Sequence, residues 1–281
     1  MKVTKYSGEV VPFDANSLRH SLTRSGATDE EVDKVYEDIK THLYDGITTR
    51  ELYEWAYAAL KKQRNSYAAR YSLKKALRDL GPEGFYFEKW ISRLFAADGF
   101  ETITGQTVQG HAVNHEIDVV AVKEDVMYAI ECKFRNDVDA KISVTTPMYF
   151  MSRLKDISDI PYDFFEGKRN FTGGCLVTNA YLTTDSISFG EYYRLNMLSW
   201  NYPVKNSLKL QVDNNGLYPI TCLSTLKQKE KTDLLKLQCI LVQDLVNHPS
   251  FLDHIDIEQH KKKHVVLEAT ELINSPLYVD R

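Results

Sequence analysis

Two carboxylates and one ammonium group in the middle of this sequence have the types and spacing that hydrolytic chemistry requires. Asp118 lies in the run HEIDVVA, and Glu131 and Lys133 lie in the run AIECKF. Side chains alternate along a strand, so Glu131 and Lys133 should point to one side and Cys132 to the other. Carboxylate oxygens are suitable ligands for Mg²⁺, and a nearby ammonium group can position a water molecule. The set therefore indicates hydrolysis of a phosphodiester bond.

A hairpin is the element that would bring these groups together. The apolar runs 117–122 and 126–130 flank the polar residues 123–125 (Lys-Glu-Asp), a pattern typical of a tight turn between two strands. Folding there lays Asp118 beside Glu131 on the neighbouring strand. A glutamate and a lysine two positions apart usually form a solvated strand face. Here the flanking residues are apolar, which favours an interior strand whose charges must be paired or bound to a metal.

The surrounding sequence predicts a mixed sheet covered by helices. A helix at 85–97 carries Glu88 beside a stripe of large apolar residues. Buried strands and further helices follow in an order that is typical of an α/β core. The expected strands, besides the two of the hairpin, span about 100–104, 107–112, 172–178 and 196–200, and the expected helices span about 146–158 and 184–195.

Residues 85–202 resemble the PD-(D/E)XK nuclease superfamily, in particular its Mrr-like restriction endonuclease branch. The resemblance is carried by FEKWISRLF, HEIDVVA, AIECKF, CLVTNAYLTTDSISF and NMLSW, in this order. It implies an endonuclease that acts on DNA with Mg²⁺ or Mn²⁺. It also implies catalytic roles for individual residues: a metal ion bound by Asp118, Glu131 and the backbone carbonyl of Cys132, a water molecule oriented by Lys133, and support for the metal from Glu88.

Residues 1–80 resemble the ATP-cone, a small helical nucleotide-binding module that regulates ribonucleotide reductases. The matching pieces are VTKYSGEVVPFDANSL, ITTREL and YAARYSLKKAL. The family usually has arginine where Tyr6 stands and lysine where Ser17 stands, so two charges that bind phosphate are missing here. The resemblance implies that ATP or dATP binds as an effector at Val3, Lys5, Gly8, Phe13 and Arg19.

A different role for the cone segment stays open. Such a module can also serve packing, dimerisation or contact with DNA. Arg70, Lys74 and Arg78 form a basic stripe at helical spacing, which fits contact with phosphate groups. Stripes of this kind are nevertheless usually solvated helix faces.

The clearest break in the chain is the Gly-Pro-Glu-Gly run at 81–84, which combines a helix stop with a turn. Beyond the core, 223–247 reads as one strongly helical stretch, and helical pattern resumes near 257–273. Residues 237–238 are Leu-Gln where a helix-hairpin-helix turn requires glycine, so that motif is not indicated. The sequence thus divides into an ATP-cone-like domain at 1–80, an endonuclease-like domain at 84–203, and a helical C-terminal region for dimerisation or DNA contact at 204–281.

Composition excludes several classes of protein. With 281 residues and 43% hydrophobic content, the chain can form real cores and is not a disordered polypeptide. No apolar run approaches the roughly 18 residues of a membrane span, and the start lacks the apolar stretch of a signal peptide. The four cysteines show no CxxC spacing. We therefore expect a cytoplasmic protein with reduced thiols and no membrane partner. The net charge of −4 still allows a local basic face for DNA.

These observations predict a Mg²⁺-dependent endodeoxyribonuclease of restriction type, with nucleotide binding to the cone as a means of regulation. A homodimer would bring two active sites to the two strands of a duplex. Two alternatives remain: a catalytically silent regulator that senses nucleotide and binds DNA, and a structure-specific repair nuclease that resolves junctions. The intact set of Glu88, Asp118, Glu131 and Lys133 argues against the silent regulator, because DNA binding alone does not need all four.

Overall fold

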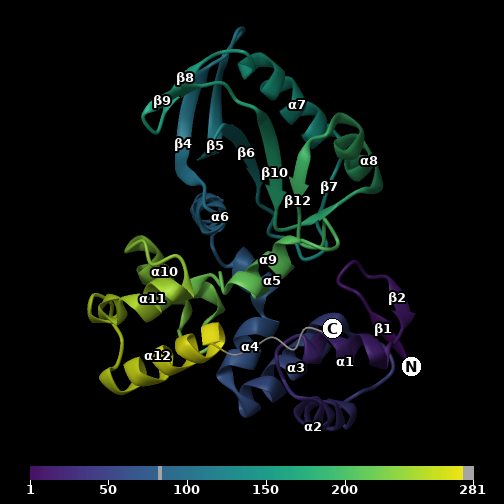
Figure 1. Cartoon of the computed structure of the whole chain (residues 1–281). Coiled ribbons are helices and arrows are strands. Elements are labelled where there is room, and N and C mark those ends of the chain that lie inside the picture. Colours follow the sequence, from purple (N-terminus) through teal and green to yellow (C-terminus); the bar gives the residue numbers. More distant parts are fainter. Residues whose placement is uncertain (82–83, 275–281) are drawn as a thin grey trace. The chain divides into compact units, whose positions relative to one another are not determined.

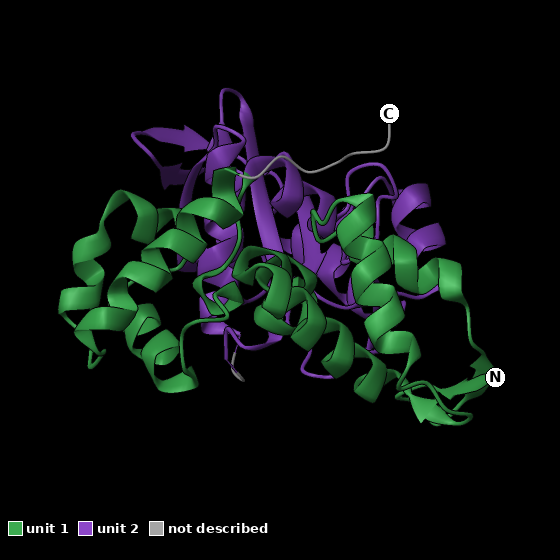
Figure 2. Ribbon diagram, turned by 90° about the horizontal axis from the view of Figure 1, so that it is seen from below, with its two compact units in different colours: residues 1–77, 216–281 green, residues 78–215 purple. Residues whose placement is uncertain are grey.

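A computed structural model of the chain describes residues 1–81 and 84–274. The chain divides into two units, one formed by residues 1–77 with the chain from Gly216 onward and the other by residues 78–215 (Figure 2). The sequence suggests three domains, and the structure groups the first and the third of these segments into one unit. Within the described residues, no helix is both long and apolar enough to cross a membrane.

A five-stranded mixed sheet forms the centre of residues 78–215. Its strands are β4 (Glu101–Gln109), β5 (Asn114–Lys123), β6 (Val126–Lys133), β10 (Gly173–Thr178) and β12 (Asn196–Leu198). They lie in the order β12–β10–β6–β5–β4 (Figure 1). Strands β4, β5 and β6 are antiparallel neighbours, whereas β10 and β12 run parallel to β6. The predicted mixed α/β core is confirmed.

Helices cover this sheet because its central strands are apolar on both faces. Helix α6 (Phe85–Ala97) packs on β4, β5 and β6, helix α7 (Thr145–Ile157) on β10, and helix α8 (Thr184–Tyr193) on β12. Helix α7 approaches β10 closely at Gly174, where a Cβ atom would lie 2.4 Å from a methyl group of Leu154. The remaining elements of this unit are β7 (Lys141–Ile142), β8 (Tyr162–Phe164), β9 (Gly167–Arg169), β11 (Tyr181–Leu182) and α9 (Leu208–Asn215).

Strand β4 differs from its prediction. The sequence predicts two short strands, at about 100–104 and 107–112, but the structure has one continuous strand across both. Gly105, with a φ of +63°, lies inside it. Residues on both sides of the glycine pair with β5 in a single register, so the backbone passes through the glycine without a break.

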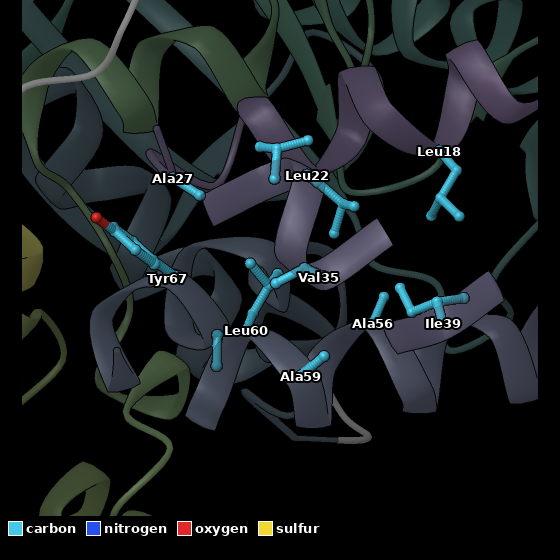
Figure 3. Close-up of a cluster of buried hydrophobic side chains, with 11 residues drawn as sticks. Leu18, Leu22, Ala27, Val35, Ile39, Ala56, Ala59, Leu60 and Tyr67 are labelled. Atoms are coloured by element: carbon cyan, nitrogen blue, oxygen red, sulfur yellow. The ribbon is translucent and has the colours of Figure 1, made fainter. Parts of the chain in front are cut away.

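The amino-terminal segment of the other unit begins with a small sheet of order β2–β1–β3 and continues as helices. The strands are β1 (Lys2–Thr4), β2 (Val10–Pro12) and β3 (Ile47–Thr48), and the helices are α1 (Ala15–Thr23), α2 (Asp29–Lys40), α3 (Thr49–Gln63), α4 (Asn65–Tyr71) and α5 (Leu73–Arg78). Side chains cap these helices: Asp14 accepts hydrogen bonds at the start of α1, and Thr28 and Thr48 form capping boxes. The apolar faces of α1, α2, α3 and α4 meet in a core that Figure 3 shows.

The carboxy-terminal segment is broken where one long helix is predicted. Its elements are η1 (Ile220–Cys222), α10 (Gln228–Lys236), α11 (Val242–Asn247), η2 (Pro249–Asp253) and α12 (Gln259–Asn274). The predicted stretch 223–247 is interrupted after α10, where Gln238 adopts a left-handed φ of +64°. The Asp244 carboxylate then accepts hydrogen bonds from the backbone of Ile240 and Leu241, which starts α11. The predicted single helix is therefore divided into α10 and α11, because the Asp244 cap begins a new helix within the stretch.

Arg70 joins the two segments of this unit. Its side chain is only 4% exposed, and it donates to the Tyr218 hydroxyl at 2.9 Å, the Leu272 carbonyl at 2.9 Å and the Ser25 carbonyl at 3.3 Å. The Arg70 guanidinium also lies close to the backbone of Gly26, where a Cβ atom would be only 2.2 Å from it. Arg70 therefore belongs to the interior of the unit, which removes it from the basic stripe that the sequence suggested for DNA contact.

We expect Arg70→Met to lower the free energy of unfolding by about 3 kcal/mol, because a buried cationic donor is removed from three acceptors. The matched control is Arg50→Met, which removes an exposed ion pair with Glu54 and should leave the stability nearly unchanged. Urea unfolding of the full chain, followed by circular dichroism, measures both changes. Equal effects of the two substitutions would show that Arg70 does not hold the segments together.

Candidate active site

The predicted hairpin is formed by β5 and β6. The two strands pair in antiparallel register from Val119 opposite Ile130 to Lys123 opposite Val126. The chain turns through Glu124, whose φ of +54° is left-handed, and Asp125. The hairpin inferred from the apolar runs is therefore confirmed, together with its turn.

Asp118 and Glu131 lie just beyond the paired part of this hairpin. In the register of the ladder they are the next opposite pair, but the ladder stops one residue earlier, at Val119 and Ile130. The Asp118 carboxylate instead accepts a hydrogen bond of 2.7 Å from the backbone N–H of Cys132. The two acidic residues therefore lie opposite each other where the backbone ladder ends, and a hydrogen bond to the Asp118 side chain replaces the backbone pairing there.

Strand β10 fixes the other edge of β6 at the same level. Glu131 and Lys133 pair with Leu176 and Thr178 in parallel register. The Thr178 hydroxyl also donates a hydrogen bond of 2.5 Å to the Lys133 carbonyl. The backbone that carries the glutamate and the lysine is therefore held by β10 after it has parted from β5.

Glu131 is buried and carries two cationic partners. The residue is 3% exposed, and its oxygens are divided between them: Lys133 binds one and Arg153 of α7 binds the other. An ionised group at this depth requires such partners, because its hydration is lost. Lys133 was expected from the sequence, but Arg153 was not. A single arginine in a predicted helix gives no signal of which strand residue it contacts.

Burial and neighbouring carboxylates raise the pKa of two acidic groups. Burial, followed by the charge of Glu131, raises the pKa of Asp118 to about 6. Burial, followed by the charges of Asp118 and Glu116, raises the pKa of Glu88 to about 7. Glu88 lies in the first turn of α6. The helix begins after its N-cap residue Gly84, which has a left-handed φ of +82°. Helix α6 therefore brings a third carboxyl group near Asp118 and Glu131, and its role in catalysis stays a prediction.

The donor set suits a hard divalent cation. Within residues 1–81 and 84–274, no group of three or more His, Cys, Asp and Glu side chains is arranged as a metal site. Mg²⁺ does not require one, since it commonly takes one or two carboxylates and retains several waters. Asp118 and Glu131 provide two oxygen-donor groups. Burial and, after it, the charge of Glu131 raise the Asp118 pKa, and a bound cation would offset both effects.

The Cys132 thiol does not belong to this set. The residue is 8% exposed, and burial raises the pKa of its thiol well above the ordinary value. A neutral, buried thiol is a poor nucleophile. Only the backbone of Cys132 therefore contributes to the site.

The two histidines that precede Asp118 are occupied by the end of α7. The His115 ring lies 2.7 Å from the Asp156 carboxylate, and that contact, with backbone donors at Ala112 and Val113, lowers the pKa of Asp156. The His111 ring lies 3.2 Å from a carbonyl at the end of the same helix. Both histidines thus fasten the β4–β5 loop to α7 rather than extend the acidic site.

The residues implied for nucleotide binding lie in the cone, where the two cations already have partners. Val3 is buried in β1 and Gly8, with a φ of +84°, lies in the turn that follows. Lys5 pairs with Glu9 at 2.9 Å. Phe13 packs on the cone core. Arg19 pairs with an aspartate of α2 and stacks on the ring of Tyr36 at 4.3 Å, so it is directed toward α2. Val3, Lys5 and Gly8 therefore belong to the β1–β2 hairpin, Phe13 follows it, and Arg19 lies on α1 with its guanidinium against α2.

Three family models match successive parts of the chain. One described as an ATP cone domain matches residues 1–80, one described as archaeal Holliday junction resolvase (Hjc) matches 81–147, and one described as AF1548-like, C-terminal, matches 218–273. The resolvase family is a member of the PD-(D/E)XK nuclease superfamily. Both predicted domain types are therefore confirmed, whereas the Mrr-like branch stays a prediction.

Two full-length relatives extend the comparison. An uncharacterized protein of Archaeoglobus fulgidus is 31% identical over 185 residues, which make up 65% of this chain and 99% of the relative. The crystal structure of a protein of unknown function, AF1548, is 28% identical with a TM-score of 0.56, and the match covers 68% of this chain and 99% of that one. The chain therefore belongs to the same family as the Archaeoglobus fulgidus protein, and it joins an ATP-cone domain to a domain of the PD-(D/E)XK nuclease superfamily.

Proposed function

We propose that this protein is a divalent-metal-dependent DNA endonuclease. One observation carries the proposal. Asp118 and Glu131 lie opposite each other where the β5–β6 ladder ends, and the Lys133 ammonium pairs with the Glu131 carboxylate. Two acidic groups whose charges repel one another are a poor arrangement for stability alone. They are a good arrangement for holding a cation beside a phosphodiester.

Each residue has a distinct task in this proposal. Asp118, Glu131 and the Cys132 carbonyl would hold Mg²⁺ or Mn²⁺, and Glu88 would support the metal from α6. When bound, the metal polarises the phosphoryl group and lowers the pKa of water. The Lys133 ammonium, which is 31% exposed, orients the attacking water and offsets the negative charge that develops on the phosphate. Water attacks phosphorus, the bond to the leaving oxygen breaks, and that oxygen takes up a proton.

Branched DNA is the substrate that the comparisons favour. The model that matches residues 81–147 describes archaeal Holliday junction resolvases, which supports a structure-specific nuclease. The restriction-type activity expected from the sequence predicts instead that linear duplex is cut. Either activity requires two cuts, one in each strand, which a homodimer would supply.

A nucleotide is the proposed effector, bound at the hairpin of the cone. The match to the ATP-cone family supports ATP or dATP. Lys5 would bind a phosphate group after its ion pair with Glu9 breaks. Arg19 would do the same after its ion pair with Asp33 on α2 breaks. Exposed ion pairs are weak, so this exchange of partners costs little.

Asp118→Ala and Lys133→Ala should each lower the rate of DNA cleavage on the order of 100-fold or more. The assay compares a four-way junction with a linear duplex of the same sequence in Mg²⁺, and the junction should be cut faster. The charge-matched controls are Asp163→Ala and Lys168→Ala, which face each other on the exposed β8–β9 hairpin and should leave the rate unchanged.

Three other outcomes have distinct meanings. Equal cleavage by the wild type and both site variants would refute the assignment of the active site. Faster cleavage of the linear duplex would return the protein to the restriction type. Tight DNA binding by a wild type that cuts neither substrate would favour the silent regulator.

Asp118→Asn should stabilise the metal-free protein at pH 8 by about 3 kcal/mol, because it removes a carboxylate whose pKa folding raises from 3.8 to about 6. The folded state binds more protons than the unfolded state between these values, so wild-type stability falls as the pH rises through that window. At pH 3 to 4 the advantage of the variant should vanish. Urea unfolding at both pH values measures this difference.

Saturating Mg²⁺ provides the internal control for that measurement. The ion should stabilise the wild type at pH 8 and leave Asp118→Asn nearly unchanged. A variant that is less stable than the metal-free wild type at pH 8 would contradict the electrostatic description of the site.

ATP and dATP should bind the full chain, and Arg19→Ala and Lys5→Ala should each weaken the binding about tenfold by removing a charged hydrogen bond to phosphate. Isothermal titration calorimetry measures the affinities. Lys34→Ala, at an exposed position of α2, is the control and should bind as the wild type does. Unchanged affinity in both site variants would move the nucleotide away from the proposed residues.

A further inference from the structure

Arg153 contacts both strands of the proposed active site. It lies on α7 with a side chain that is 11% exposed. One nitrogen of its guanidinium pairs with the Glu131 carboxylate on β6, and another donates to the backbone carbonyl of Glu116 on β5. A single side chain from a helix thus binds the two strands that carry the acidic groups.

The position of this contact is informative. The β5–β6 ladder ends at Val119 and Ile130, so Glu116 and Glu131 lie in the part where the strands have separated. A guanidinium is planar and holds its donors in a fixed fork, so two acceptors bound to it are fixed relative to each other. Arg153 therefore sets the separation of the strands where backbone pairing no longer does.

Helix α7 is itself held firmly enough to serve this purpose. Phe150 and Ile157 are buried beneath it. One turn after Arg153, Asp156 accepts hydrogen bonds from the backbone of Ala112 and Val113 in the β4–β5 loop. Two successive turns of the helix therefore contact β5 and the loop that precedes it, and the arginine side chain is largely buried.

Glu131 has a second cation, and the two partners differ in their surroundings. Lys133 binds the other oxygen and is 31% exposed, whereas Arg153 is 11% exposed. If Lys133 were the sole partner, its departure would leave a buried and unpaired charge. With Arg153 in place, Lys133 can turn toward a water molecule or a phosphate while Glu131 keeps one cationic partner.

We propose that Arg153 is a positioning residue that fixes the Glu131 carboxylate as a metal ligand and frees Lys133 for the attacking water. This inference rests on the proposed function, since it assigns the metal to Asp118 and Glu131. In this arrangement Arg153 acts through its contacts with the Glu131 carboxylate and the Glu116 carbonyl, and it takes no direct part in the reaction.

Whether removal of Arg153 raises or lowers the metal affinity distinguishes a positioning role from simple charge balance. If Arg153 only neutralised Glu131, removing it would strengthen the attraction of the site for a divalent cation. If Arg153 fixes the carboxylate, removing it should weaken metal binding, as the loss of a residue that orients a ligand commonly does by 10- to 100-fold. Arg153→Lys retains the positive charge but not the planar guanidinium. This variant should keep the wild-type metal affinity if Arg153 only balances charge, and lose affinity if Arg153 fixes the carboxylate.

The experiment is titration of the metal-free full chain with Mn²⁺ at pH 8, without DNA. Arg153→Ala should bind Mn²⁺ at least about tenfold more weakly than the wild type, and Arg153→Lys and Arg153→Gln should lie between them. Lys155→Ala is the matched control, because it removes one positive charge from an exposed position of the same helix and should leave the affinity unchanged. Circular dichroism verifies folding, and if Arg153→Ala does not fold, the Lys and Gln variants decide.

Metal affinity in Arg153→Ala that equals or exceeds that of the wild type overturns the inference, and so does a wild type that binds no Mn²⁺. The nuclease assignment fails separately: a wild type whose Mn²⁺ binding depends on Arg153 but which cuts no DNA supports the positioning role and refutes the enzyme. Where cleavage is present, Arg153→Ala should lower kcat at least about tenfold and leave KM for DNA unchanged.

Discussion

The burial of one carboxylate constrains the architecture around the proposed site. Glu131 lies in an interior strand and is 3% exposed, where an ionised group is costly unless cations hold it. Its own strand supplies Lys133, and α7 supplies Arg153. Packing of α7 on β10, where Leu154 lies close against Gly174, brings that arginine to the strand. The helix is therefore part of the site as well as a cover for the sheet.

Repulsion among the other acidic groups acts in the opposite direction. Asp118 and Glu88 both have a raised pKa because burial and neighbouring carboxylates disfavour their charged forms. The ladder between β5 and β6 ends beside Asp118, whose side chain takes the place of backbone pairing there. The protein thus tolerates a locally unfavourable cluster that a divalent cation would make favourable. This is the pattern expected where binding, rather than stability, has selected the residues.

The other unit uses a buried cation for a structural purpose. Arg70 reaches Ser25 in the cone and both Tyr218 and Leu272 in the carboxy-terminal segment, so the beginning and the end of the chain share one interior. Lys5 and Arg19, in contrast, make exposed ion pairs within the cone. Exposed pairs exchange partners easily and buried networks do not. This difference separates cations suited to ligand exchange from one that holds segments together.

The sequence by itself determined the local elements and the acidic motif. Apolar runs around a polar turn predicted the hairpin with Asp118 and Glu131, and helix 85–97 was predicted with Glu88 in it, because these patterns depend on neighbours in the chain. The tertiary structure alone decided the rest. Arg153 and Arg70 each bind residues that are far away in sequence, and the β5–β6 ladder ends at Val119, within both strands. Such contacts depend on how whole elements pack, which no local spacing of residue types encodes.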